Sequence, residues 1–199
     1  MDRLRTAVRE QFAPVGVLVT GTAGLLALGT ATGQANRPVY ALVVLGGAVA
    51  VARLHLRVGL STATIWGLVA FALGHLAGGM VPVGDGILYQ VWLVDGVLRY
   101  DNLQHLGFGF VGRAIWEALR HRLAPSGPDL PGVTRWIVVL GATAAGAVNE
   151  IVEYVLTLVL PEHSVGGYDN TARDLVADLV GGLAVGWWTG RRARAATRL

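Results

Sequence analysis

The sequence contains no cysteine and no lysine, and charged residues make up only 15% of its 199 positions. Without cysteine, the chain has no disulfide framework, no thiolate nucleophile, no cysteine zinc site and no cysteine-ligated iron–sulfur cluster. All 16 basic residues are arginine, which we attribute to codon composition and not to a chemical requirement. Only three serines are present, so the sequence offers little to a serine-based hydrolytic mechanism.

Apolar residues dominate what remains, at 53% of the chain with a mean hydropathy of +0.54. A helix that crosses the hydrocarbon layer needs about 20 mainly apolar residues. Six such stretches, joined by short connections, use most of the chain, at about 14–31, 39–56, 60–80, 101–119, 133–160 and 171–190. We therefore predict an all-α polytopic membrane protein, a bundle of about six transmembrane helices that forms a single transmembrane domain over residues 1–199.

The arginines predict the orientation of this bundle, because basic residues are retained on the cytoplasmic side. With the N-terminus in the cytoplasm, most arginines near helix ends are cytoplasmic, and three are on the outer side: Arg37, Arg99 and Arg173. Both termini are then cytoplasmic. The first apolar stretch is long for a signal-peptide core, so we expect it to be retained. Arginines at helix ends explain the pI near 9.8 without nucleic-acid binding, which we do not expect.

Pairs of glycines in two of the apolar stretches predict close helix packing. Gly29 with Gly33 and Gly182 with Gly186 stand four residues apart in apolar stretches, and this spacing favours close approach of helix backbones.

The semi-apolar segment 83–98 lies between the third and fourth predicted helices and contains Tyr89 and Trp92. We predict that it forms an interfacial helix or a re-entrant cover on the outer side.

Ionisable side chains gather in the predicted outer half of the bundle. They are His75, Asp101, His105, Glu150, Glu153, Asp174 and Asp178. Six of them form pairs three or four residues apart, so the two members of each pair share a helix face. Because one charge at a helix centre costs roughly 3 kcal/mol in a membrane, these faces are expected to point inward. Arg99 and Arg173 cannot neutralise five carboxylates, so a bound cation, shared protons or water must do so.

Carboxylate oxygens and imidazole nitrogens suit hard or borderline divalent ions, which favours a divalent metal site at these seven residues. Zinc, manganese, magnesium and calcium cannot be ranked from the sequence. A purely structural interpretation stays open, in which Asp101 and Asp174 cap helix starts, Glu150 pairs with Arg173, and the histidines make buried hydrogen bonds.

Several motifs together carry a resemblance to a known family: Gly74-His75, Tyr100-Asp101 with His105, Glu150 with Glu153, and the run from Tyr168-Asp169 to Asp174 and Asp178. From the third helix onward, the chain resembles the YjdF-type family of uncharacterised bacterial inner-membrane proteins, and more faintly VanZ-like proteins. The resemblance implies a small helical bundle in the bacterial inner membrane, but no reaction. Members of that family often carry a histidine before the Tyr-Asp pair, where this chain has Arg99, which implies one ligand fewer here.

Our leading functional hypothesis is a metal-dependent hydrolase that acts on a lipid-linked or envelope substrate at the outer face. Glu153 or Asp178 is the predicted general base, and Arg99, Arg173 and Tyr100 are the predicted substrate-binding residues. The alternative is a transporter or channel-like protein that couples cations or protons, or a non-catalytic membrane scaffold with a structural ion. The bilayer is the expected partner. A homo-oligomer and a lipid-linked small molecule are further partners compatible with the sequence.

Overall fold

The structure, a computed structural model, describes residues 9–123, 131–160 and 165–196. Apart from two short hairpins, these residues are mainly helical, which confirms the predicted all-α membrane fold. The chain divides into two compact units, Met1–Gln104 and His105–Leu199, which are described one after the other. The prediction of a single transmembrane domain remains a prediction.

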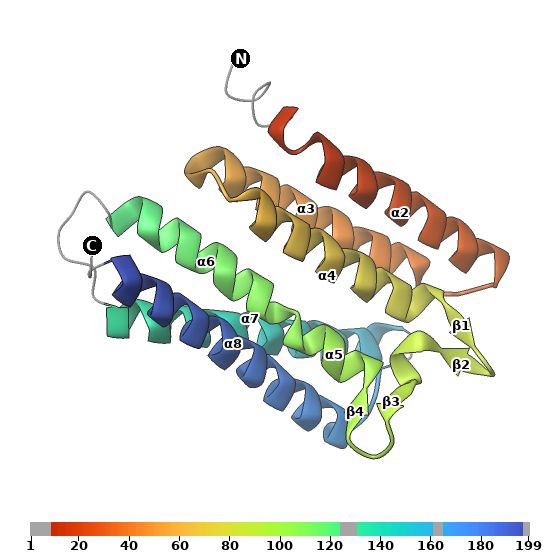
Figure 1. The fold of residues 1–199 in the computed structure, drawn as a ribbon. Coiled ribbons are helices and arrows are strands. Elements are labelled where there is room, and N and C mark those ends of the chain that lie inside the picture. The colour runs from red at the N-terminus through yellow and green to blue at the C-terminus, as the bar shows by residue number, and fades with distance from the viewer. Residues whose placement is uncertain (1–8, 124–130, 161–164, 197–199) are drawn as a thin grey trace. The chain divides into compact units, whose positions relative to one another are not determined.

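Three helices form the first unit: α2 (Phe12–Ala31), α3 (Arg37–Val58) and α4 (Thr62–Met80) (Figure 1). Their bounds lie within a few residues of the first three predicted spans. Gly21 of α2 faces Leu73 of α4, and Gly29 faces Met80, so these two helices run in the same direction. The sulfur of Met80 occupies the space that a Cβ at Gly29 would need, so a side chain and not a second helix backbone fills the room that this glycine leaves.

Gly33 does not share that role. It lies beyond the end of α2 with φ of 74°, so it forms a turn instead of a helix contact. A φ in this region favours glycine, because a side chain there would be strained.

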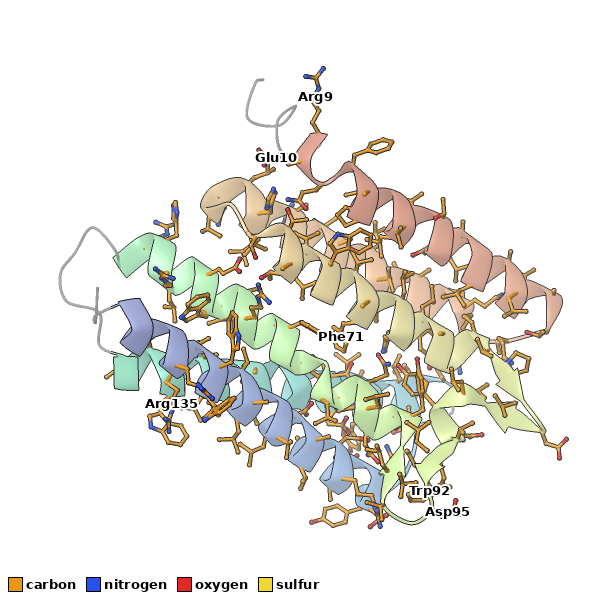
Figure 2. The ribbon with its side chains drawn as sticks, viewed as in Figure 1. Arg9, Glu10, Phe71, Trp92, Asp95 and Arg135 are labelled. Atoms are coloured by element: carbon orange, nitrogen blue, oxygen red, sulfur yellow. The ribbon has the colours of Figure 1, made fainter. Side chains whose placement is uncertain are left out.

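Two small hairpins follow α4, where the sequence predicted an interfacial helix or re-entrant cover. Their elements are β1 (Pro82–Val83), β2 (Gly86–Ile87), the short 3-10 helix η1 (Leu88–Gln90), β3 (Trp92–Val94) and β4 (Leu98–Arg99). Gly84 and Gly96 turn the chain with φ of 57° and 69°. Trp92 and Asp95 mark the second hairpin in Figure 2. The interfacial-helix prediction is wrong, because these glycines allow tight turns between paired strands.

The second unit is built from α6 (Phe108–Leu123), α7 (Pro131–Val159) and α8 (Tyr168–Ala196), preceded by α5 (Tyr100–Leu106), which begins at the end of the first unit. Gly181 of α8 is so close to the carbonyl oxygen of Leu106 that a Cβ would clash with it, and Gly182 lies against the carbonyl of Val139. Gly186 packs on Val139 as well, which confirms the predicted Gly182/Gly186 packing face. The backbone of α8 therefore closely approaches that of Leu106 at Gly181 and that of α7 at Gly182.

Four helices among the described residues are long and apolar enough to cross a membrane, namely α2, α3, α4 and α7. The other two predicted spans, 101–119 and 171–190, fall on α5 with α6 and on α8. All six predicted stretches are therefore helical. Charged and polar residues lower the hydropathy of the last two, and three of these residues, His105, Asp174 and Asp178, belong to the site described next.

Candidate metal centre

His105 is the centre of a buried group of polar side chains in the second unit. Only 3% of the residue is exposed. Its Nδ1 atom lies 3.0 Å from Oδ1 of Asp178, and its Nε2 atom lies 3.4 Å from Oε1 of Glu150. Asp178 belongs to α8 and Glu150 to α7, so one imidazole connects carboxylates of two other helices. Asp178 is fully buried, and Glu150 is buried as well.

Glu153 adds a third side chain on the α7 side of His105. One ligand atom each from His105, Glu150 and Glu153 lie within 4.8 Å of one another. The amide of Asn149 donates to Oε1 of Glu153 at 2.8 Å, across one turn of α7. Glu153 is therefore held in place by its own helix while its carboxylate faces the histidine.

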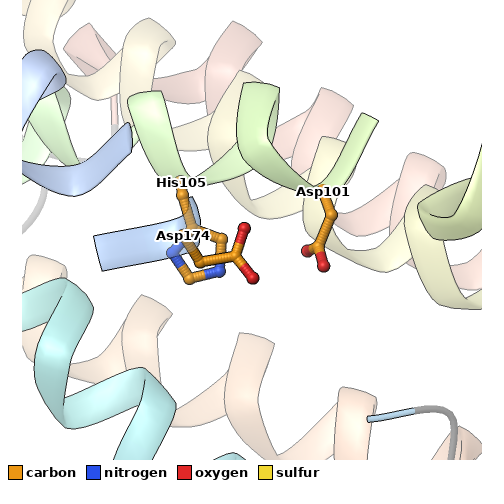
Figure 3. A group of neighbouring side chains, drawn as sticks. All are labelled: Asp101, His105 and Asp174. Carbon is orange, nitrogen blue, oxygen red and sulfur yellow. The ribbon is translucent and has the colours of Figure 1, made fainter. Parts of the chain in front are cut away.

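Asp174 approaches His105 from α8. A carboxylate oxygen of Asp174 and a ring nitrogen of His105 lie within 4.8 Å of each other, and Figure 3 shows the two side chains side by side. Asn170, one turn earlier on α8, donates its amide N–H to Oδ2 of Asp174. Asp174 lies inside α8, six residues after Tyr168, and not at the helix start. The interpretation of Asp174 as a helix cap is therefore wrong.

Gly146 explains how Asp178 fits between the helices. The carboxylate of Asp178 occupies the space that a Cβ at Gly146 would fill, on the same face of α7 as Glu150, one turn later. A larger residue at position 146 would displace the carboxylate that contacts His105. This glycine therefore shapes the site even though it has no functional side chain.

The charge balance of the second unit is strongly negative around His105. Four carboxylates surround one imidazole: Glu150, Glu153, Asp174 and Asp178. Arg173 directs its Nε to the exposed Asp169, four residues earlier on α8, at 2.8 Å. Glu150 contacts His105, and its predicted pairing with Arg173 stays a prediction. Buried carboxylates in this number need a cation or protons to offset their desolvation.

Four predicted site residues belong to the first unit. Nδ1 of His75 contacts the hydroxyl of Tyr89, and the guanidinium of Arg99 lies 4.4 Å above the Trp92 ring. The Tyr100 hydroxyl donates to the carbonyl of Gly74 at 3.0 Å. The roles of these three in ligation or substrate binding remain predictions.

Asp101 is the fourth of these residues. It stands in the first turn of α5, one turn before His105, so the two side chains share a face of one helix (Figure 3). Helix α5 therefore supports the predicted Asp101–His105 pair. The ligand role of Asp101 stays a prediction.

Sequence reasoning missed the residues that support the carboxylates. Asn149 and Asn170 each stand four positions before an acid that they hold. A search for amide residues at that spacing would have found both, because such pairs stabilise helices. Gly146 has no comparable signal, since its role depends on the packing of α7 against α8.

Four described helices of membrane-spanning length define the chain as a polytopic helical membrane protein. Residues 13–195 match the family described as "Predicted membrane protein (DUF2238)", and the chain belongs to that family. This match confirms the resemblance to the YjdF-type membrane proteins seen in the sequence. No curated protein and no solved structure matched the chain.

Proposed function

We propose that this protein binds a divalent metal ion at His105 and Glu150, and uses it to hydrolyse a lipid-linked or envelope substrate. The 3.4 Å between Nε2 of His105 and Oε1 of Glu150 carries the proposal. Two ligands of a tetrahedral zinc ion with bonds of about 2.0–2.1 Å are separated by roughly 3.3–3.4 Å. The two atoms therefore have the spacing that a shared small cation requires.

Asp178 orients the histidine in this arrangement. A metal-binding histidine usually donates its second ring N–H to a carboxylate, which fixes the tautomer and the ring orientation. The 3.0 Å contact between Nδ1 of His105 and Asp178 supplies that partner and leaves Nε2 to the metal. Because Asp178 is engaged in this way, the predicted general-base role passes to another carboxylate.

The third ligand comes from Glu153 or Asp174, since each has an oxygen within 4.8 Å of a ligand atom of His105. Whichever of the two is not a ligand is available as the general base. A divalent ion at this centre would polarise a carbonyl or phosphoryl group of the substrate. The predicted outer position of the cluster would make it accessible from the non-cytoplasmic side of the bacterial inner membrane.

Elemental analysis of purified protein tests metal binding. Wild-type protein should contain about one divalent ion per chain, and Glu150→Gln should lose it. Asp169→Asn is the matched control, because Asp169 is exposed and paired with Arg173. A wild-type protein that contains no metal after chelator-free purification, and binds none on titration, would contradict the proposal.

Glu153→Gln and Asp174→Asn then separate ligand from base. The ligand variant should lose the ion, whereas the base variant should keep it and lose hydrolysis. Phosphate release from phosphatidic acid and from a polyprenyl diphosphate provides the assay, with and without chelator. If both variants keep the metal and hydrolyse either probe like wild type, neither residue has the proposed role.

A proton- or cation-coupling function is the second candidate, and the position of His105 between two carboxylates favours it. An imidazole with a carboxylate at each ring nitrogen can accept a proton on one side and release it on the other. Proteoliposomes that contain a pH-sensitive dye distinguish this function. A proton flux that His105→Ala abolishes, in protein that contains no metal, would favour coupling over hydrolysis.

A further inference from the structure

Tryptophan and arginine side chains gather at one end of the second unit. Four of the six tryptophans lie there, each beneath a guanidinium group. The pairs are Arg113 over Trp188 at 4.8 Å, Arg120 over Trp116 at 5.0 Å, Arg135 over Trp136 at 5.4 Å, and Arg191 over Trp187 at 4.7 Å. Guanidinium groups at these distances are attracted to the negative face of the ring.

Two of these pairs, Arg113 with Trp188 and Arg120 with Trp116, belong to one group at the contact of α6 with α8. Trp116 of α6 and Trp188 of α8 meet edge to face, with ring centroids 5.3 Å apart, and Trp116 is buried. Arg113 also pairs with Glu117, with its Nε 3.6 Å from the carboxylate. The aromatic contact and the ion pair account for this inner group as packing between α6 and α8.

The other two pairs face outward. Trp136 is 51% exposed and Trp187 is 60% exposed. The side chain of Arg135 crosses from α7 to α8, because Gly186 and Gly190 leave room for its methylene groups. The Arg135 side chain therefore lies beside the last turns of α8, where Arg191 is the residue after Gly190. Figure 2 labels Arg135 at this end of α7.

Among the described residues of α7 and α8, this surface carries arginines and no carboxylate. From position 131 to 149, and again from 179 to 196, the sequence contains no aspartate or glutamate. The carboxylate nearest to it along α7 is Glu150, 15 residues beyond Arg135, which corresponds to about 22 Å of helix. This surface is therefore separate from the metal centre. Its positive charge and its exposed tryptophan rings suit a ligand that has both an anionic group and an apolar part.

We propose that Arg135 and Arg191, flanked by Trp136 and Trp187, bind the headgroup of an anionic phospholipid. Guanidinium groups bind phosphate through two parallel hydrogen bonds. Tryptophan rings prefer the headgroup level of a bilayer and bring the arginines to that depth. Basic sites between membrane helices are known to hold anionic headgroups of this kind. This inference does not depend on the proposed hydrolytic function.

Lipid retention in phosphatidylcholine nanodiscs tests the proposal, with phosphatidylglycerol titrated in and bound lipid measured by native mass spectrometry. Each arginine near a headgroup changes affinity for an anionic lipid by about fivefold, so Arg135→Gln/Arg191→Gln should weaken binding by roughly 25-fold. Arg53→Gln/Arg57→Gln in α3 removes the same charge and should change binding less than threefold. Raised salt should weaken wild-type binding.

Equal retention of phosphatidylglycerol and phosphatidylcholine by the wild type would overturn the proposal. An equal loss in the two double variants would overturn it too, because binding would then follow total charge. If the double variant does not purify as folded protein, Arg191→Gln alone keeps the test decisive. Arg191 is exposed near the C-terminal end of α8. Its substitution should weaken phosphatidylglycerol binding about fivefold, and unchanged binding would refute its role.

Discussion

Substituting Gly146 with alanine should destabilise the protein, although alanine is normally the better helix residue. The added Cβ would occupy the space of the Asp178 carboxylate, which is fully buried. Overpacking of this kind costs about 1–3 kcal/mol. Displacing Asp178 also breaks its hydrogen bond to His105, which adds about 1.5–3 kcal/mol. The helix preference of alanine returns roughly 0.5–1 kcal/mol, so the net loss should be about 2–5 kcal/mol.

Denaturant unfolding in detergent, followed by tryptophan fluorescence, measures this loss. Gly47→Ala in α3 is the matched control, because nothing lies within 4 Å of the added Cβ. It should leave stability unchanged or raise it slightly, by up to about 1 kcal/mol. If Gly146→Ala is as stable as Gly47→Ala, Asp178 does not pack against α7, and the reasoning behind the site is refuted.

Three further predictions follow from the contacts within each unit. Asp178→Asn should lower metal affinity about 10–100-fold, measured by competition with a fluorescent chelator, because His105 loses its orienting carboxylate; unchanged affinity would exclude that role. Gly181→Ala should lower the thermal midpoint by several degrees, because the added Cβ meets the carbonyl oxygen of Leu106; an unchanged midpoint would contradict this close approach. Tyr89→Phe should cost about 0.5–1.5 kcal/mol in the same unfolding assay, because it removes the hydrogen bond to the α4 histidine, and no loss would show that the bond contributes nothing.

Helix positions could be predicted from the sequence because a backbone surrounded by lipid has no water to bond to. Each spanning segment must satisfy its own hydrogen bonds, so long apolar runs become helices. The hairpins at 82–99 are not predicted by the semi-apolar composition of this segment, because they depend on its turn residues. Gly84-Asp85 and Asp95-Gly96 are dipeptides that favour hairpin turns, and Gly84 and Gly96 have the positive φ that these turns need. In a short semi-apolar segment, such local signals outweigh overall hydropathy.

The candidate site was only partly predictable. Helical spacing correctly placed Glu150 with Glu153, and Asp174 with Asp178, on shared faces. Which carboxylate meets which ring nitrogen of His105 depends on how closely α5, α7 and α8 approach. That approach is set by Gly146, Gly181 and other glycines whose partners are far away in the sequence. Single-sequence spacing carries no information on such contacts.

X-ray absorption spectroscopy of the zinc-loaded protein tests the central claim most directly, since it reports the ligand atoms around the ion. We expect oxygen ligands with an imidazole contribution at about 2.0–2.2 Å. His105→Ala should remove imidazole scattering, whereas His121→Ala, at an exposed position on α6, should leave it unchanged. An imidazole signal that persists unchanged in His105→Ala, or a spectrum without ordered protein ligands in the wild type, would contradict the metal centre proposed at His105 and Glu150.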